Sequence, residues 1–152
     1  MLSDVAILIP AYEPDAPLVA LVAQLRPLFA HLVIVDDGST TPAARTAFAA
    51  IRPQVDALLV HDVNRGKGAA LRTGIAWVQE HLPTVCAIVT ADADGQHLPA
   101  DISRVAEAAR GYPNGLVLGV RAFSGKVPFR SRLGNFWARL LFRLLTDRKS
   151  VV

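Results

Sequence analysis

The sequence predicts an α/β protein with a mainly parallel central sheet flanked by helices. Short apolar runs rich in Val and Ile alternate along the chain with stretches whose apolar residues recur at helical spacing. A polar cluster follows each apolar run, as expected where ligands bind beyond the carboxyl ends of parallel strands. The length of 152 residues, with 52% hydrophobic and 19% charged residues, is that of one globular domain with a sizeable core.

The first half of the chain is predicted to hold three strands and two helices. Residues 5–9 form a β-branched apolar run closed by Pro10, which is typical of a buried strand. Apolar residues at a spacing near 3.6 predict helices over 17–29 and 42–51. Further strands are expected at 32–35 and 57–60.

The second half continues the alternation. A helix is expected from the glycine-rich loop at 64–68 to about residue 81, then a strand in the run before Asp92, then a helix that begins near Pro99 and ends at Gly111. Residues 116–120 are predicted as a fifth strand that leads to Arg121. Residues 129–145 form a basic amphipathic pattern, which fits either a helix on a membrane surface or one packed on the sheet with solvated arginines.

Asp92 and Asp94 stand one residue apart at the end of an apolar run. In extended chain both side chains point the same way, and Gly95 then allows the backbone to turn. Two adjacent carboxylates favour a bound cation, and hard oxygen ligands suit Mg²⁺ or Mn²⁺. A solvated turn is the alternative if the pattern is taken alone. A calcium loop of the EF-hand type fits worse, because Ser103 stands where its bidentate Glu is required.

The loop Asn64-Arg65-Gly66-Lys67-Gly68 precedes a predicted helix. Its glycines allow close backbone approach, and the helix N-terminus with Arg65 and Lys67 would attract a diphosphate. Taken alone, the glycines are equally consistent with an ordinary loop that leads into a helix.

Charge is distributed unevenly along the chain. The net charge of +3 combines −4 over residues 1–120 with +7 over residues 121–152. The basic end suits phosphates, an anionic membrane or plain solvent exposure. A nucleic-acid-binding role is disfavoured, because it leaves the polar loops unexplained.

No apolar run is long enough for a membrane span, which favours a cytoplasmic protein. Cys86 is expected to be a buried small hydrophobe.

Taken together, these motifs resemble the family 2 glycosyltransferases, which have the Rossmann-like GT-A sandwich fold. The resemblance covers nearly all of residues 5–146. Its motifs are Ile9-Pro10-Ala11-Tyr12 with Glu13, Val35-Asp36-Asp37-Gly38-Ser39, the 64–68 loop and Asp92-Ala93-Asp94-Gly95-Gln96-His97. The last motif, with Leu118-Gly119-Val120-Arg121 and Pro128-Phe129-Arg130-Ser131-Arg132, is most similar to the polyprenyl-phosphate branch, of the dolichol-phosphate mannose type.

The resemblance implies a role for each motif. Asp37, with Asp36 and Glu13, would accept hydrogen bonds from the nucleotide base or ribose in a pocket lined by Pro10 and Tyr12. Metal binding would fall to Asp92, Asp94 and Gln96. Donor or acceptor phosphates would be neutralised by Arg65, Lys67, Arg121, Arg130 and Arg132. Asp94, Arg121 and Arg130 are thus the expected catalytic residues. His97 is expected to be a turn residue, and His31, His61 and His81 to be ordinary strand-edge or helix residues.

The implied activity is that of an inverting glycosyltransferase, dependent on Mg²⁺ or Mn²⁺, that moves a sugar from a UDP or GDP donor to a polyprenyl phosphate. Peripheral association with the inner face of the plasma membrane would suit such an acceptor. Two alternatives stay open: a nucleotide-sugar-binding fragment without turnover, and a transferase acting on a glycan hydroxyl.

Residues 1–146 are expected to be an incomplete catalytic domain, because family members continue into a further acceptor-side segment. Residues 147–152 are expected to be a non-native tail, since a common sequencing-adapter sequence encodes these six residues.

Overall fold

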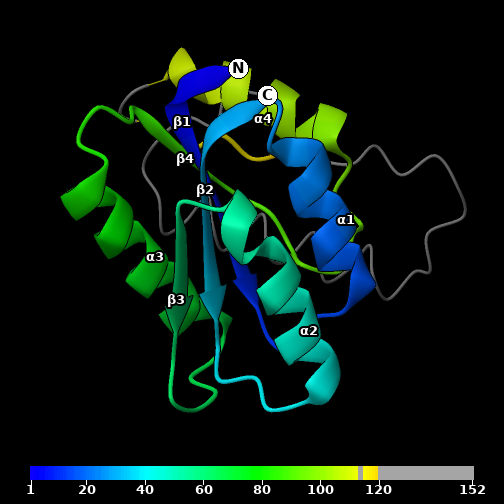
Figure 1. The fold of residues 1–152 in the computed structure, drawn as a ribbon. Helices are drawn as coiled ribbons and strands as arrows, with labels where there is room; N and C mark the ends of the chain where they lie inside the picture. Colours follow the sequence, from blue (N-terminus) through cyan, green and yellow to red (C-terminus); the bar gives the residue numbers. More distant parts are fainter. Residues whose placement is uncertain (113–114, 120–152) are drawn as a thin grey trace, which may run out of the picture. The chain divides into compact units, whose positions relative to one another are not determined.

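The computed structural model describes residues 1–112 and 115–119 as a parallel sheet with helices on both faces (Figure 1). The strands are in the order β3-β2-β1-β4, and every paired neighbour is parallel. The predicted α/β class is therefore confirmed. In chain order the elements are β1 (Leu2–Ala11), α1 (Ala16–Leu25), β2 (Phe29–Asp36), α2 (Pro42–Ile51), a 3-10 turn (Arg52–Gln54), β3 (Ala57–Val60), α3 (Lys67–His81), β4 (Ala87–Thr90) and α4 (Pro99–Arg110).

Strand β1 is an inner strand of the sheet and is deeply buried. Ile7 pairs with Leu32 of β2 on one side and with Val89 of β4 on the other. The stretch from Val5 to Ile9 is fully buried, because helices cover both of its faces. This explains why the run is apolar throughout and does not alternate.

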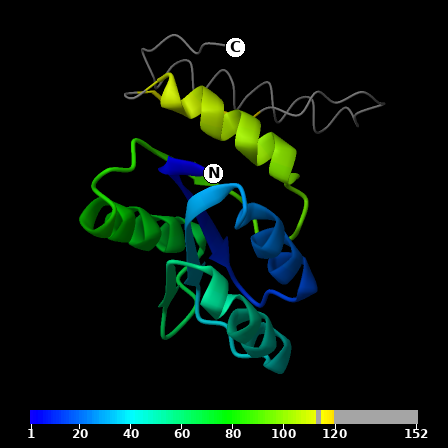
Figure 2. The ribbon, with the colours of Figure 1, turned by 45° about the horizontal axis from the view of Figure 1, so that its top comes forward.

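Each face of the sheet has its own apolar cluster. On one face Ile7 and Ile34 pack with buried side chains of α1, α2 and α4. On the other face Leu8 and Val35 pack with α3. Figures 1 and 2 show α1 and α2 on the opposite side of the sheet from α3. Gly74 of α3 lies so close to Leu8 that a Cβ atom on it would stand 2.2 Å from Leu8 Cδ1, so any larger residue there would force the buried Leu8 side chain to move.

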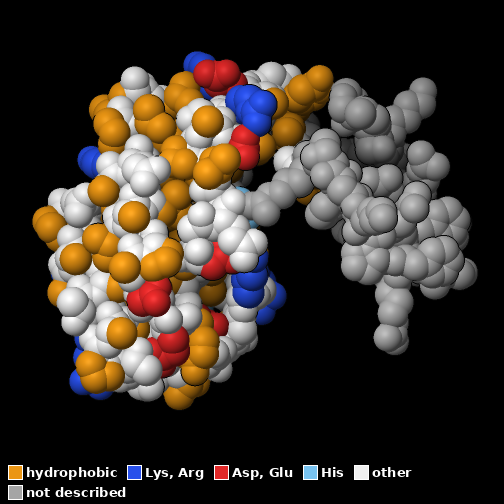
Figure 3. Space-filling view, turned by 90° about the vertical axis from the view of Figure 1, so that its right-hand side faces the viewer, with side chains coloured by type: hydrophobic (Ala, Val, Ile, Leu, Met, Phe, Trp, Pro, Cys, Tyr) orange, Lys and Arg blue, Asp and Glu red, His pale blue; other side chains and the backbone are white. Residues whose placement is uncertain are grey.

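The outer side of α1 and α2 carries many apolar side chains, as the space-filling view shows (Figure 3). Small residues of both helices line a groove there: Ala16, Val19, Ala20 and Ala23 from α1, and Ala43, Ala47 and Ala50 from α2. Asp15 is the one charged residue that lines this groove among the described residues.

Helix α1 ends earlier than predicted. The pattern predicted a helix to residue 29, whereas α1 ends at Leu25 and Phe29 begins β2, fully buried. Pro27 explains the difference, because it has no N–H to donate to the preceding turn and so cannot continue the hydrogen bonds of the helix.

The prediction that Cys86 is buried is wrong, because its thiol is exposed. Cys86 stands one residue before β4, which is a border strand of the described sheet. Its backbone N–H donates to the carbonyl of Asp4 at 2.8 Å, and its Sγ lies 3.2 Å from the same oxygen. The residue thus extends the pairing of β1 with β4 by one residue before β4 begins.

The predicted fifth strand is wrong over residues 116–119, which are described but form no strand. Leu116 and Leu118 are 77% and 67% exposed, so their side chains are not packed against a sheet. Arg121, Arg130, Arg132, the predicted helix over 129–145 and the expected tail over 147–152 all lie outside the described residues. Among the helices that the structure describes, none is long and apolar enough to span a bilayer.

Candidate functional site

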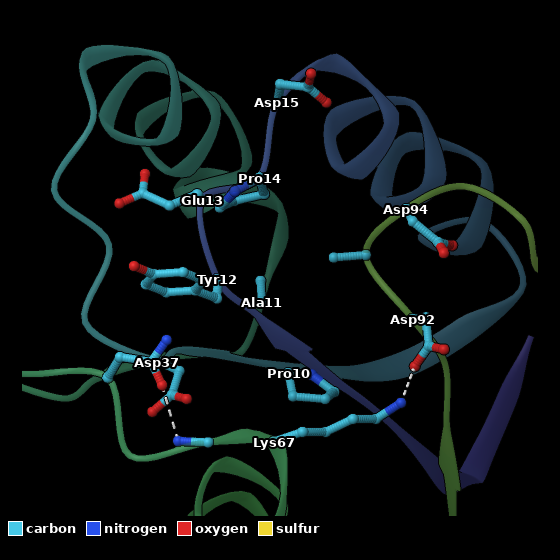
Figure 4. Close-up of a pocket in the computed structure, with 13 residues that line it drawn as sticks. Pro10, Ala11, Tyr12, Glu13, Pro14, Asp15, Asp37, Lys67, Asp92 and Asp94 are labelled. Atoms are coloured by element: carbon cyan, nitrogen blue, oxygen red, sulfur yellow. Dashed lines mark hydrogen bonds and ion pairs between the residues drawn. The ribbon is translucent and has the colours of Figure 1, made fainter.

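All four strand ends contribute to one open pocket of about 500 Å³ (Figure 4). The polar clusters that follow the four strands therefore lie at one edge of the sheet. In the close-up, Tyr12 and Asp37 lie on one side of the pocket and Asp92 and Asp94 on the other. The lining residues are Pro10 and Ala11 at the end of β1, Tyr12, Glu13, Pro14 and Asp15 after it, Asp37 after β2, Asn64, Gly66 and Lys67 after β3, and Asp92, Ala93 and Asp94 after β4.

Asp37 is a buried carboxylate held in place by hydrogen bonds. Its backbone N–H donates to the carbonyl of Ala11 at 2.8 Å, and its Oδ1 accepts the backbone N–H of Arg65 at 3.0 Å. Nδ1 of His61 lies 2.7 Å from the same Oδ1. Burial alone would raise the pKa of Asp37, but the hydrogen bonds from Arg65 and His61 outweigh it and hold the pKa below its usual value.

Asp36 does not line this pocket. It is the last residue of β2 and points away from Asp37, because successive side chains of extended chain alternate between faces. Its Oδ1 accepts the backbone N–H of Ser39 at 2.8 Å, which stabilises the turn after β2.

Glu13 links the end of β1 to the start of α2. Its backbone is left-handed, with φ of 48°, and its carboxylate accepts the backbone N–H groups of Thr40 and Thr41 at 2.8 and 3.1 Å. The hydroxyl of Thr41 also donates to it, and this bond, with the amide of Thr40, lowers the pKa of Glu13 to about 2. Much of the hydrogen-bonding capacity of Glu13 is thus used within the chain, whereas Tyr12 beside it is 54% exposed.

The loop after β3 presents Lys67 to the acidic side of the pocket. Gly66 has φ of 86°, which glycine adopts readily, and its N–H donates to Oδ1 of Asn64 at 2.9 Å. Helix α3 then begins at Lys67, whose Nζ lies 2.5 Å from Oδ1 of Asp92. Arg65 supplies its backbone to Asp37, but it is not among the residues that line the pocket.

Asp92 lies between two nitrogen-bearing side chains. Lys67 lies at Oδ1, and Nε2 of His97 is 3.6 Å from Oδ2. The hydrogen bond from Lys67 is the main reason that the pKa of Asp92 lies below its ordinary value. Oδ1 of Asp94 accepts the backbone N–H of Gln96 at 2.9 Å, and Gln96 is not among the residues that line the pocket.

Asp92 and Asp94 are better suited to a divalent ion that also binds a ligand than to an ion that is held by protein groups alone. Within residues 1–112 and 115–119, no three His, Cys, Asp or Glu side chains come together as a metal site. Mg²⁺ commonly binds through one or two carboxylates plus substrate phosphates and water. Asp92 and Asp94 supply that donor set at the pocket.

The sequence matches the family described as Glycosyl transferase family 2 over residues 6–151. The chain belongs to this family. It is 28% identical over 149 residues to the uncharacterised protein MJ1222 of Methanocaldococcus jannaschii, and 26% identical over 139 residues to the uncharacterised protein MJ0544 of the same organism. These matches cover 93% and 90% of this chain but 58% and 60% of the relatives, so the chain spans about three fifths of their length.

In this family 2 chain, the contact of His61 with the pocket residue Asp37 was not predicted from the sequence. His61 was expected to be an ordinary strand-edge residue, but it is 7% exposed and contacts Asp37. The available signal was its place, one residue beyond β3 at the carboxyl edge of the sheet, where the other polar clusters also lie.

Proposed function

We propose that the chain is the donor-binding part of an inverting glycosyltransferase that uses a nucleoside-diphosphate sugar. The observation that carries the proposal is a single pocket that offers an anchored acceptor, Asp37, on one side and a cation with two carboxylates, Lys67 with Asp92 and Asp94, on the other. A nucleoside diphosphate has matching parts, namely N–H and O–H donors on its base and ribose and anionic oxygens on its diphosphate. Membership of family 2 supports the same activity.

The nucleoside would lie on the side of Tyr12 and Asp37. An ionised carboxylate is an acceptor only, so Asp37 favours a base edge or ribose that donates hydrogen bonds. The half-exposed side chain of Tyr12 and the ring of Pro10 offer apolar surfaces beside it.

The diphosphate would lie toward Lys67, where a divalent ion would be held jointly by its oxygens and by Asp92 and Asp94. A bound Mg²⁺ or Mn²⁺ supplies a Lewis acid for the charge that develops on the leaving nucleoside diphosphate. Lys67 would exchange its contact with Asp92 for one with a phosphate oxygen.

The proposed acceptor is a polyprenyl phosphate. Its phosphate oxygen would bond to the anomeric carbon as the bond from that carbon to the diphosphate breaks, and the nucleoside diphosphate would leave with the electron pair. Such an acceptor is ionised at neutral pH and needs no general base. This suits the pocket, since the lowered pKa values of Asp37 and Asp92 make both carboxylates weak bases. The +7 charge of residues 121–152 suits a lipid phosphate and peripheral attachment to an anionic membrane.

Calorimetric titration of the 152-residue chain with UDP and GDP, each with and without Mn²⁺, tests the donor site. Metal-dependent binding of one nucleotide is the expected result, and binding of neither by folded chain would overturn the proposal. Incubation with the matching nucleotide sugar and a short polyprenyl phosphate then separates the activities. Transfer supports the full reaction, whereas binding without transfer identifies a donor-binding fragment.

A further inference from the structure

His61 is a buried side chain that contacts the pocket only through another residue. It follows β3, and its backbone N–H donates to the carbonyl of Asp36 at 2.9 Å, which continues the pairing of β2 and β3 by one residue. The imidazole is 5% exposed and is not among the residues that line the pocket. Its Nε2 lies 2.9 Å from Oγ1 of Thr73 in α3.

The hydrogen bonds around the imidazole determine which nitrogen carries a proton. An ionised carboxylate can only accept, so Nδ1 must donate to Oδ1 of Asp37 across the 2.7 Å contact. In the neutral ring Nε2 then accepts the hydroxyl proton of Thr73. The backbone N–H of Arg65 reaches the same Oδ1 at 3.0 Å. Two donors from the segment after β3 therefore hold one oxygen of Asp37.

We propose that His61 is a positioning residue, which holds the carboxylate of Asp37 at the angle that the nucleoside half of the donor requires. Thr73 in turn fixes the imidazole, so the chain of contacts runs from α3 through His61 to the pocket. Each link is within hydrogen-bond distance, and all three residues are at least half-buried. The inference rests on the proposed function and adds a residue to the donor site.

Two substitutions at His61 distinguish a hydrogen bond that positions Asp37 from a side chain that only fills space in the core. In His61→Asn the amide nitrogen can stand where Nδ1 stands, so a donor to Asp37 is retained. In His61→Leu the side chain is of similar size but has no donor. We expect His61→Leu to weaken UDP or GDP binding about tenfold or more, because loss of a hydrogen bond to a charged group has an effect of that size. His61→Asn keeps the donor and should retain affinity within about threefold of the wild type. Pyrophosphate with Mn²⁺, which lacks base and ribose, should bind both variants like the wild type.

His31 provides a matched control. It lies in β2 near the opposite end of the sheet, with Nδ1 4.0 Å from Oδ1 of Asp56. His31→Leu removes a partly buried imidazole beside an aspartate, as His61→Leu does, but far along the strand from the pocket. Its nucleotide affinity should equal that of the wild type.

The imidazole of the wild-type chain gives a measurement that does not depend on any variant folding. Nitrogen-15 NMR should show His61 protonated at Nδ1, with a resonance that moves when nucleotide is added. A ring protonated only at Nε2, or unchanged nucleotide affinity in folded His61→Leu, would overturn the inference while leaving the donor site intact. A wild-type chain that binds neither nucleotide would overturn the proposed function, and the inference with it.

Discussion

The ammonium group of Lys67 lies 2.5 Å from Oδ1 of Asp92, so the chain itself places a cation at the acidic side of the pocket. Both side chains are partly exposed, at 60% and 41%, and their pairing is therefore weak enough to be exchanged for other partners. A divalent ion at Asp92 would compete with Lys67, whereas a diphosphate would attract both.

Replacement of Lys67 by Met should therefore have opposite effects on two ligands. Mn²⁺ alone should bind about two- to fivefold more tightly, because the competing ammonium is gone. UDP or GDP with Mn²⁺ should bind about tenfold more weakly, because a charged phosphate contact is lost. Manganese titration by electron paramagnetic resonance and calorimetry would measure both. Arg72→Met, with the same charge change on the exposed surface of α3, is the control, and weaker binding of both ligands to Lys67→Met would contradict the exchange.

Asp94→Ala should remove the metal-dependent part of nucleotide binding while the fold survives. Asp94 lines the pocket and is exposed, so its loss should change the free energy of unfolding by less than about 0.5 kcal/mol. Calorimetry with and without Mn²⁺, beside urea unfolding, would measure both effects. Asp62→Ala, an exposed aspartate that does not line the pocket, is the matched substitution. Equal nucleotide affinity in Asp94→Ala and wild type would argue strongly against metal binding by this residue.

Glu13 should make stability depend on pH in the acid range. Its pKa is lowered from 4.5 to about 2 by the Thr41 hydroxyl and the neighbouring amides, so folding favours the ionised form. The resulting stabilisation is present above pH 4.5 and is lost as pH falls from there through 2. Urea unfolding of wild type and Glu13→Gln across this range should give curves that converge as pH falls. Curves that stay parallel would show that Glu13 is not stabilised in this way.

Gly38→Ala should destabilise the chain and displace the loop after β3. Gly38 has φ of 77°, and a Cβ atom there would stand 2.3 Å from the carbonyl carbon of Val63. The left-handed backbone and the clash should together cost about 2–5 kcal/mol. Gly68→Ala is the control, because its Cβ would meet only Arg72 Nη1 at 3.7 Å, and helical alanine should be neutral or stabilising. Thermal unfolding would compare the two, and equal midpoints would contradict the close packing of Gly38.

The sheet and its polar edge could be predicted because each depends on local sequence. The apolar run of β3 at Ala57–Val60 and the helix α2 at Pro42–Ile51, which begins with a proline, were both predicted with their observed bounds. The shared pocket followed from topology, since parallel strands bring their carboxyl ends to one edge.

The contacts within the pocket could not be predicted in the same way, because they join residues far apart in sequence. His61 meets Asp37 across 24 positions, and Glu13 meets Thr41 across 28. Apolar character alone also gave a wrong prediction at Leu116 and Leu118, which were expected in a strand but have exposed side chains. A strand needs a partner with free backbone groups, and a one-dimensional pattern does not show whether that partner is present.

The two sides of the pocket rest on strands of different burial. The stretch of β2 before Asp37 is fully buried from Leu32 to Val35, whereas in β4 only Val89 is buried and Asp94 beyond it is exposed. Local opening is easiest where few apolar contacts hold the backbone. Ala91, just beyond β4, is still buried. Amide hydrogens beside Asp37 should therefore exchange with solvent more slowly than those near Asp94. A nucleoside bound beside Asp37, as we propose, would therefore meet the more deeply buried side of the pocket, while the more exposed segment around Asp94 could adjust around phosphate.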